Sequence, residues 1–305
     1  MEERVRSTKN LRKRQNGVAF LFLSPWLIGF TLLTLGPIMG SLYLSFTDYD
    51  LFSKPEWAGL DNYARLVGGD PRYIQSLMVT LNYVVFSVPL KLGFALFIAL
   101  ILNRGLRGLG FYRSVFYLPS LLGGSVAVAL MWRQIFSYDG IINQFLWNYL
   151  GYDAPSWITN PDYALGTLVL LAAWQFGAPM VIFLAGLKQI PQDMYDAAAI
   201  DGARPMQQFV FVTIPLLTPI IFFNFVMQTI GAFQAFTPSY IISDGTGGPA
   251  DSTLFYTLYL YEQAFTNFEM GYASAIAWVL VAIIAGATSI SFLTAKYWVH
   301  YGDEG

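Results

Sequence analysis

Cysteine and histidine are almost absent from this sequence, and charged residues are scarce. Its 305 residues include no cysteine and one histidine, His300, and only 12% of them are charged. The lack of cysteine excludes disulfides, thiol chemistry and cysteine-ligated metals, and a single histidine argues against histidine-based catalysis. Because an ordinary soluble domain has about a quarter charged residues, the shortage here indicates that lipid forms much of the solvent. A soluble enzyme is therefore not expected.

The chain also has no net positive charge. The net charge is −2, and the one basic concentration is a short N-terminal tail. Proteins that bind DNA or RNA need a basic surface, so no nucleic-acid partner is expected.

The sequence has instead a set of long apolar stretches, and about 20 apolar residues cross a bilayer as a helix. A shorter apolar segment, 252–261, suits a surface helix better than a span. One long stretch contains Lys91 as its only charge, and the others contain none. The sequence therefore predicts an all-α, polytopic membrane protein with six transmembrane helices, in the stretches 17–47, 74–103, 114–132, 163–187, 205–243 and 270–295.

Lysine and arginine are unevenly distributed between the predicted loops. Because positively charged loops stay on the cytoplasmic side, we expect a multi-pass protein of the plasma (inner) membrane with both termini in the cytoplasm. The outer side then holds only Lys54, Arg65, Arg72 and Arg133. The inner side holds Arg4, Arg6, Lys9, Arg12, Lys13, Arg14, Arg104, Arg107, Arg113, Lys188, Arg204 and Lys296.

These spans and loops divide the chain into segments. The expected order is a basic cytoplasmic tail at 1–16, the first transmembrane helix at 17–47, an outer loop at 48–73, a core domain at 74–295 and a cytoplasmic tail at 296–305. The core domain is expected to contain five transmembrane helices and a cytoplasmic loop at 187–209.

No energy source accompanies these spans. The chain contains no GxxxxGK[ST] phosphate loop, and no glycine is followed by lysine. Every aspartate and glutamate lies outside the predicted spans, whereas ion-coupled carriers keep acids within them. A carrier that binds sodium through backbone carbonyls stays open as an alternative. If the protein transports a solute, we expect the energy to come from another subunit.

The cytoplasmic loop at 187–209 has the signals of a short helix followed by a bend. Pro191 can begin the helix, and Gly202 can supply the left-handed residue that ends it. Small and acidic side chains between them allow close contact with a partner surface. The alternative is a solvated loop whose alanines only favour a helix. The residues expected to make the contact are Asp196, Ala197, Ala198, Asp201 and Gly202.

The spacing in this loop resembles a family motif. Asp196-Ala197-Ala198 is followed after three residues by Gly202, and after nine more by Val212-Thr213-Ile214-Pro215. The family pattern is Glu-Ala-Ala, three residues, Gly, nine residues, Ile-x-Leu-Pro, in the membrane permease subunits of binding-protein-dependent ATP-binding-cassette (ABC) importers. The chain departs from it at 196, where aspartate is one methylene shorter than glutamate, and conservatively at 212 and 214.

The resemblance extends along nearly the whole chain and is strongest to the first permease of the maltose and glycerol-3-phosphate importers. It implies the ABC type I importer permease fold and a non-catalytic subunit for import of a sugar, oligosaccharide or sugar derivative. The implied partners are a second homologous permease, two ATP-binding subunits and an extracytoplasmic solute-binding protein. The loop helix is then the coupling helix, seated in an ATPase.

The resemblance also bears on cofactors and on rival functions. It implies that this chain binds no cofactor or metal and that partner subunits use the ATP and Mg. The alternatives are the same subunit role for a non-carbohydrate solute, an ion-coupled secondary transporter, and a membrane scaffold that transports nothing.

Polar side chains in the predicted spans are candidates for contact with a sugar. Asn224 and Gln228 are four residues apart and share a helix face, with Gln234 at its edge. Gln175 lies beside Trp174, and an amide next to an aromatic face suits a pyranose ring. Such amides can instead join helices within the membrane, and this alternative stays open.

Lys91 is the remaining candidate for the substrate path. It lies about a dozen residues from the inner end of its predicted span, roughly 18 Å at helical rise, which is beyond the reach of its side chain. We expect it to face protein or water, where it contacts substrate, an acid of the second permease or helix carbonyls.

Overall fold

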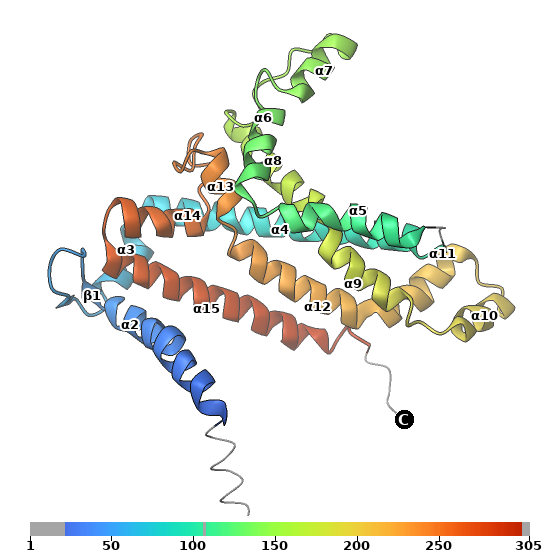
Figure 1. Ribbon diagram of the computed structural model, residues 1–305, viewed down its shortest axis with the longest axis horizontal. Coiled ribbons are helices and arrows are strands. Elements are labelled where there is room, and N and C mark those ends of the chain that lie inside the picture. The colour runs from blue at the N-terminus through green and yellow to red at the C-terminus, as the bar shows by residue number, and fades with distance from the viewer. Residues whose placement is uncertain (1–21, 106–107, 301–305) are drawn as a thin grey trace, which may run out of the picture.

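The computed structural model describes residues 22–105 and 108–300, which form an elongated helical bundle (Figure 1). Helices make up the regular structure of these residues except for two short paired strands, β1 (Thr47–Asp48) and β2 (Glu56–Trp57). The predicted tail 1–16 and the end of the predicted C-terminal tail, 301–305, lie outside the described residues.

Six spans can be assigned within this part of the chain. Two pairs of helices each form a bent span, with an angle of 95° between the first pair and 42° between the second. The pairs are α5 (Leu109–Leu122) with α6 (Val126–Ile135), and α8 (Pro161–Trp174) with α9 (Gly177–Leu187). The unbent spans are Phe22–Leu44, α4 (Pro71–Leu102), Pro205–Phe233 and α15 (Met270–Ala295). The protein is therefore an all-helical, polytopic membrane protein, as predicted.

The N-terminal span lies at the edge of the bundle, where its second half, α2 (Gly36–Leu44), packs against α15. It contains a π-helical turn, η1 (Thr31–Leu35), and most of its large apolar side chains are exposed. Such exposure fits a helix surrounded by lipid.

The predicted outer loop 48–73 is largely ordered and contains helix α3 (Asp61–Gly68) as well as the strand pair. The side chain of Asn62 donates hydrogen bonds to the backbone oxygens of Ser45, at 3.1 Å, and Thr47, at 2.9 Å. These bonds attach α3 to the end of the N-terminal span.

Helix α4 is the centre of the bundle and packs against α8, α9, α12 (Ile214–Phe233) and α14 (Tyr256–Tyr261). Ala95 and Ala99 of α4 are completely buried. Small residues four positions apart let membrane helices approach closely. The core therefore runs along α4, where Met180 and Phe183 of α9 also belong to it.

The predicted third span, 114–132, is not a straight helix, because α5 and α6 meet at 95°. The break falls at Gly123 and Gly124, and glycine has a low preference for helix. Ser125 then caps α6, where its side chain accepts a hydrogen bond from the backbone N–H of Val128 at 3.4 Å. As a result α5 packs beside α9, whereas α6 packs against α13 (Thr237–Ile242).

The predicted fifth span, 205–243, divides into two parts. A continuous helix runs through α11 (Pro205–Gln208), the π-helical η2 (Phe209–Thr213) and α12, and α13 follows as a separate short helix. Helix α7 (Ile141–Leu150) projects from the bundle beyond α6 (Figure 1).

The segment 252–261, predicted to lie on the surface, is instead deep inside the bundle. Leu254 and Tyr256 are fully buried. The backbone N–H of Tyr256 donates to Oγ1 of Thr80 at 2.8 Å, and its hydroxyl donates to the carbonyl oxygen of Ile276 at 2.8 Å. The short helix α14 and the following π-helical turn η3 (Glu262–Thr266) therefore fill space beside α4 and α15.

Candidate functional site

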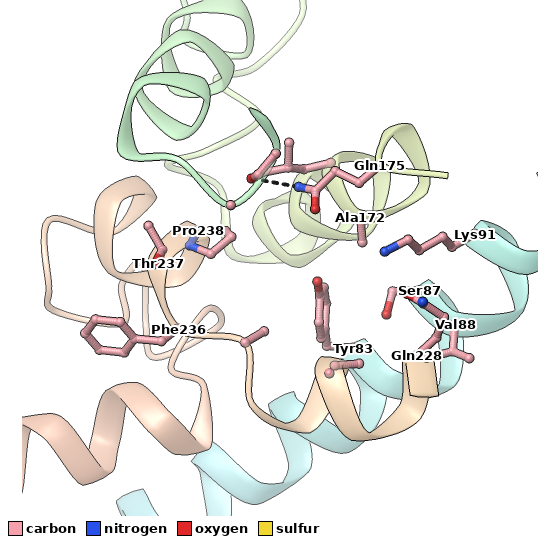
Figure 2. Close-up of a pocket in the computed structure, with 16 residues that line it drawn as sticks. Tyr83, Ser87, Val88, Lys91, Ala172, Gln175, Gln228, Phe236, Thr237 and Pro238 are labelled. Atoms are coloured by element: carbon pink, nitrogen blue, oxygen red, sulfur yellow. Dashed lines mark hydrogen bonds between the residues drawn. The ribbon is translucent and has the colours of Figure 1, made fainter. Parts of the chain in front are cut away.

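A cavity of about 290 Å³ lies inside the bundle (Figure 2). It is lined by α4, by the two helix breaks and by the C-terminal part of α12 with the residues that follow it. Hydroxyls, amides, an ammonium group and aromatic rings line it together, and the polar members are Tyr83, Ser87, Lys91, Gln175, Gln228 and Thr237. Few polar groups in a mainly apolar wall are typical of a small-molecule site.

The two helix breaks support each other at one wall of this cavity. Nε2 of Gln175 donates to the carbonyl oxygen of Gly123 at 2.9 Å. Oγ of Ser120 donates to the carbonyl oxygen of Gln175 at 2.8 Å and accepts from the N–H of Ala178 at 2.9 Å. Backbone groups that the breaks release thus find protein partners, as non-helical backbone within a membrane requires.

Helix α4 contributes a polar stripe to the opposite wall. Tyr83, Ser87 and Lys91 are four residues apart and so share one helix face. Figure 2 shows the ammonium of Lys91 and the hydroxyls of Tyr83 and Ser87 pointing toward the cavity. Of these three residues only Lys91 was predicted from the sequence, although the four-residue spacing on one helix also indicates Tyr83 and Ser87.

Three of the five predicted path residues meet at the cavity: Lys91, Gln175 and Gln228. Asn224 is fully buried instead, where its Nδ2 donates to the carbonyl oxygen of Ile220 at 3.1 Å, and its Oδ1 has no partner in the described part of the chain. Gln234 follows the end of α12 and is exposed. The structure therefore does not bring the predicted stripe on α12 together as one lining surface.

The predicted coupling loop contains helix α10 (Gln192–Ile200), which projects from one end of the bundle (Figure 1). It begins directly after Pro191, as predicted. Gly202 has a φ of +82°, a left-handed conformation that glycine adopts without strain. The N–H of Ala203 donates back to the carbonyl oxygen of Ala198 at 2.9 Å and so closes the helix end.

The surface of α10 combines short, acidic and apolar side chains. Asp196, Ala197, Asp201 and Gly202 are exposed, and Ala198 is half-buried. Large apolar side chains on this loop are exposed as well, with Ile200 at 87% and Met206 at 70%. Large exposed apolar side chains on a projecting loop are typical of a surface for a protein partner.

One side chain joins α10 to the helix that enters the bundle. The hydroxyl of Tyr195 and Oγ1 of Thr213 are 3.0 Å apart and share a hydrogen bond. Thr213 ends η2, and α12 continues from it toward the cavity. This role of Tyr195 was not predicted from the sequence.

Asp70 joins three elements at the opposite end of α4. Its Oδ2 accepts hydrogen bonds from the hydroxyls of Tyr259 and Tyr272, and its Oδ1 accepts from the N–H of Tyr73 at 3.0 Å. Burial raises the pKa of Asp70, but these hydrogen bonds outweigh burial and hold the pKa below its ordinary value. The bonds therefore favour the charged carboxylate and tie α14 and α15 to the start of α4.

Ion pairs surround Asp70. Arg72 pairs with Asp251 at 3.0 Å and with Glu262 at 2.6 Å, and Arg65 pairs with Glu269 at 2.7 Å. These contacts connect α3 and α4 to segments nearly 200 residues later in the chain, so no local sequence pattern could indicate them.

Comparison with known proteins identifies the family. The model of the binding-protein-dependent transport system inner membrane component matches residues 66–297. The probable ABC transporter permease protein YesP of Bacillus subtilis (strain 168) is 55% identical, over 98% of this chain and 97% of its own. The lactose transport system permease protein LacF of Rhizobium radiobacter is 33% identical, over 95% of this chain and 98% of its own.

A solved structure has the same fold. It is a bacterial alginate ABC transporter in complex with an alginate pentasaccharide-bound periplasmic protein, and one chain matches with a TM-score of 0.79 at 18% identity. The match covers 95% of this chain and 97% of that one. The family model and the permease relatives show that the chain belongs to the family of binding-protein-dependent transport system inner membrane components, the permease subunits of ABC importers.

Proposed function

We propose that this chain is one of two permeases that form the translocation path of an ABC importer for a sugar, oligosaccharide or sugar derivative. The observation that carries the proposal is α10, a short projecting helix with exposed Asp196, Ala197 and Ile200. A helix of this kind fits a groove on another protein. The partner in the groove is an ATP-binding subunit, of which the complete importer has two.

In this proposal each subunit of the importer has a separate role. The two ATP-binding subunits bind ATP and Mg²⁺ and hydrolyse the nucleotide. A solute-binding protein delivers the cargo to the side of the membrane opposite α10. This chain and a second homologous permease enclose the path between them.

The distribution of positive charge supports the α10 end as the cytoplasmic one. Arg104 and Arg204 lie near α10, whereas Arg65 and Arg72 lie at the other end of α4. The C-terminal segment belongs to the α10 end, because the N–H of His300 donates to Oγ1 of Thr218, near the start of α12, at 2.9 Å. The N-terminal span runs from Phe22 toward α3 at the opposite end. Both termini are cytoplasmic in this proposal.

The coupling route leads from α10 to the cavity. When ATP binding brings the ATP-binding subunits together, α10 moves with them, and the Tyr195–Thr213 hydrogen bond passes the movement to the helix Pro205–Phe233. Gln228 of that helix lines the cavity. It lies 15 residues beyond Thr213, or about 22 Å at 1.5 Å per residue. A movement of α10 therefore changes one wall of the cavity directly.

The chemistry of the cavity supports a carbohydrate cargo. Gln175 and Gln228 offer amides, Ser87 offers a hydroxyl, and Tyr83 and Phe236 offer aromatic rings. In water, sugar hydroxyls form hydrogen bonds with the solvent, and amides and hydroxyls of the protein can take the place of these water molecules. LacF is named as a lactose permease, and the solved structure with the same fold is an alginate transporter; both names support the same cargo class.

The experiment is ATP hydrolysis by the reconstituted importer in lipid, with and without sugar-loaded binding protein. We expect loaded binding protein to stimulate hydrolysis. Hydrolysis that no loaded binding protein changes, or uptake that needs an ion gradient and no ATP, would contradict the proposal.

A matched pair of variants tests α10 itself. Gly202→Trp places a bulky side chain on the partner surface, so we expect the ATP-binding subunits no longer to copurify. Gly151→Trp is the control, because Gly151 also has a positive φ and open space around it but lies after α7. Equal copurification with both variants would contradict the role of α10.

A further inference from the structure

Lys91 is the one lysine, arginine or acidic side chain among the residues that line the cavity. It is half-buried on α4, and it makes no hydrogen bond or ion pair with any residue that the structure describes. A cation inside a membrane protein normally pairs with an acid or with water in a functional cavity. The question is therefore what neutralises its charge.

Within the spans that the structure describes, no acid lies within reach of Lys91. In the described spans the one aspartate or glutamate is Asp162, in the first turn of α8. It precedes Gln175, at the cavity wall, by 13 residues, or about 20 Å along the helix. Asp70, at the start of α4, precedes Lys91 by 21 residues, or about 32 Å.

Lys91 also cannot reach either membrane surface. It lies 11 residues before the end of α4 at Leu102, which is about 17 Å along the helix. A lysine side chain is much shorter than this distance, so snorkelling does not account for it. Its ammonium points into the cavity instead (Figure 2).

The groups around Lys91 are suited to a ligand with both charge and hydroxyls. Nε2 of Gln175 is already used by the carbonyl oxygen of Gly123, which leaves the amide oxygen to accept a hydrogen bond. Figure 2 shows this oxygen facing the cavity, across from Ser87 and Tyr83. An ammonium supplies up to three donors to an anion, and the neutral groups around it can bind hydroxyls.

We infer that the cavity selects an anionic carbohydrate, a sugar that carries a carboxylate or a phosphate ester, and that Lys91 provides its counter-charge. This inference rests on the proposed function and names the class of sugar that the path accepts. Charge-assisted hydrogen bonds are about twice as strong as neutral ones. Lys91 therefore favours anionic over neutral sugars of the same size.

The test is uptake by the complete importer in proteoliposomes, with its binding protein and ATP. The probes are a hexuronate oligosaccharide, a hexose phosphate and the neutral oligosaccharide and hexose of the same length. We expect the wild-type importer to take up an anionic probe in preference to its neutral counterpart, and the two anionic probes distinguish carboxylate from phosphate recognition.

Variants then assign the preference to Lys91. We expect Lys91→Gln to lower the ratio of anionic to neutral uptake about tenfold or more, the size of a lost charge-assisted bond, and Lys91→Arg to restore most of it. Lys296→Gln removes the same charge at an exposed position after α15 and should leave the ratio unchanged.

The outcomes separate the two proposals. A wild-type importer that takes up neutral sugars alone, or a Lys91→Gln variant with an unchanged ratio, overturns the role of Lys91 and leaves sugar import standing. Loss of copurification with the second permease in Lys91→Gln would show that Lys91 pairs with an acid of that subunit, which also overturns it. An importer that takes up none of the four probes contradicts sugar import itself.

Discussion

The amide nitrogen of Gln175 donates a 2.9 Å hydrogen bond to the carbonyl oxygen of Gly123, 52 residues earlier in the chain. The bond joins the break between α8 and α9 to the break between α5 and α6. Both breaks form one wall of the cavity, so the shape of the cavity depends on this contact.

Gly123→Ala should therefore destabilise the transporter. A Cβ at this position would lie 2.2 Å from Cδ of Gln175. Overpacking of this kind costs about 1–3 kcal/mol of unfolding free energy. The measurement is the thermal unfolding temperature of the purified complex in detergent, which we expect to fall.

Two further variants make this prediction specific. A Cβ at Gly124 would meet nothing within 4 Å, so Gly124→Ala should change the unfolding temperature little. Gln175→Ala removes the clashing atoms, so the double variant with Gly123→Ala should lose less stability than the sum of the single variants. Equal effects of Gly123→Ala and Gly124→Ala would contradict the proposed clash.

Helix α15 contains two glycines whose substitution by alanine should affect stability in opposite ways. A Cβ at Gly271 would lie 2.1 Å from the backbone oxygen of Thr47, whereas a Cβ at Gly286 would meet nothing within 4 Å. Backbone cannot move aside as a flexible side chain can, so Gly271→Ala should cost at least about 1–3 kcal/mol. Gly286→Ala should be neutral or stabilise by up to about 1 kcal/mol, because alanine favours helix.

The same unfolding assay checks this pair. Since both glycines belong to one helix, a difference between the variants reports the contact with Thr47 of β1 and not the helix itself. A Gly271→Ala variant as stable as Gly286→Ala would show that α15 does not approach Thr47 so closely.

The spans were predictable because apolar length alone determines whether a helix can cross lipid, and α10 was predictable because Pro191 and Gly202 are local signals. The bend at Gly123 was not predicted, because the apolar stretch continues through it. The burial of Tyr256 was not predicted either: a short apolar helix has the same composition whether it lies on the surface or beside α4. Only tertiary contacts decide between the two.

The functional polar residues, too, could be predicted from the sequence only in part. Lys91 was identified because a charge in a span is conspicuous, whereas Asn224 and Gln228 were grouped by helical spacing although only Gln228 lines the cavity. Asp70 lies 189 and 202 residues from its hydrogen-bond donors Tyr259 and Tyr272. No local pattern can indicate partners at such separations.

Loss of the Tyr195–Thr213 hydrogen bond should impair the coupling of ATP hydrolysis to transport. Tyr195→Phe removes the bond, worth about 1 kcal/mol, and keeps the ring. We expect the ATP-binding subunits still to copurify but transport per ATP hydrolysed to fall about fivefold, the factor that corresponds to this energy. The measurement is sugar uptake together with ATP hydrolysis in proteoliposomes.

Thr213→Val should produce at least the same defect, because it removes this bond and also the 3.5 Å bond from Oγ1 to the carbonyl oxygen of Gln208. The double variant should be no worse than Thr213→Val alone. Tyr297→Phe is the matched control, since Tyr297 is 78% exposed. Unchanged coupling in Tyr195→Phe would show that movement of α10 reaches α12 by another route.

The charged carboxylate of Asp70 should contribute to the stability of the protein at neutral pH, and this contribution should be lost in acid. Its folded-state pKa lies below the ordinary value because, despite burial, the hydrogen bonds from Tyr259, Tyr272 and Tyr73 favour the carboxylate. A depressed pKa contributes stability above the unfolded value, about 3.9, and this contribution is lost as the pH falls through the folded value. Asp70→Asn should therefore lower the unfolding temperature at neutral pH and flatten its decline in acid.

The measurement is the unfolding temperature of the purified complex from about pH 7 down to about pH 3, a range that includes the unfolded pKa of aspartate. Asp139→Asn makes the same change at an exposed residue between α6 and α7 and should leave the curve nearly unchanged. Tyr259→Phe removes one donor to the carboxylate, so it should move the curve in the same direction as Asp70→Asn but less far. An Asp70→Asn curve that coincides with that of the wild type would mean that the carboxylate is not what holds α14 and α15 to the start of α4.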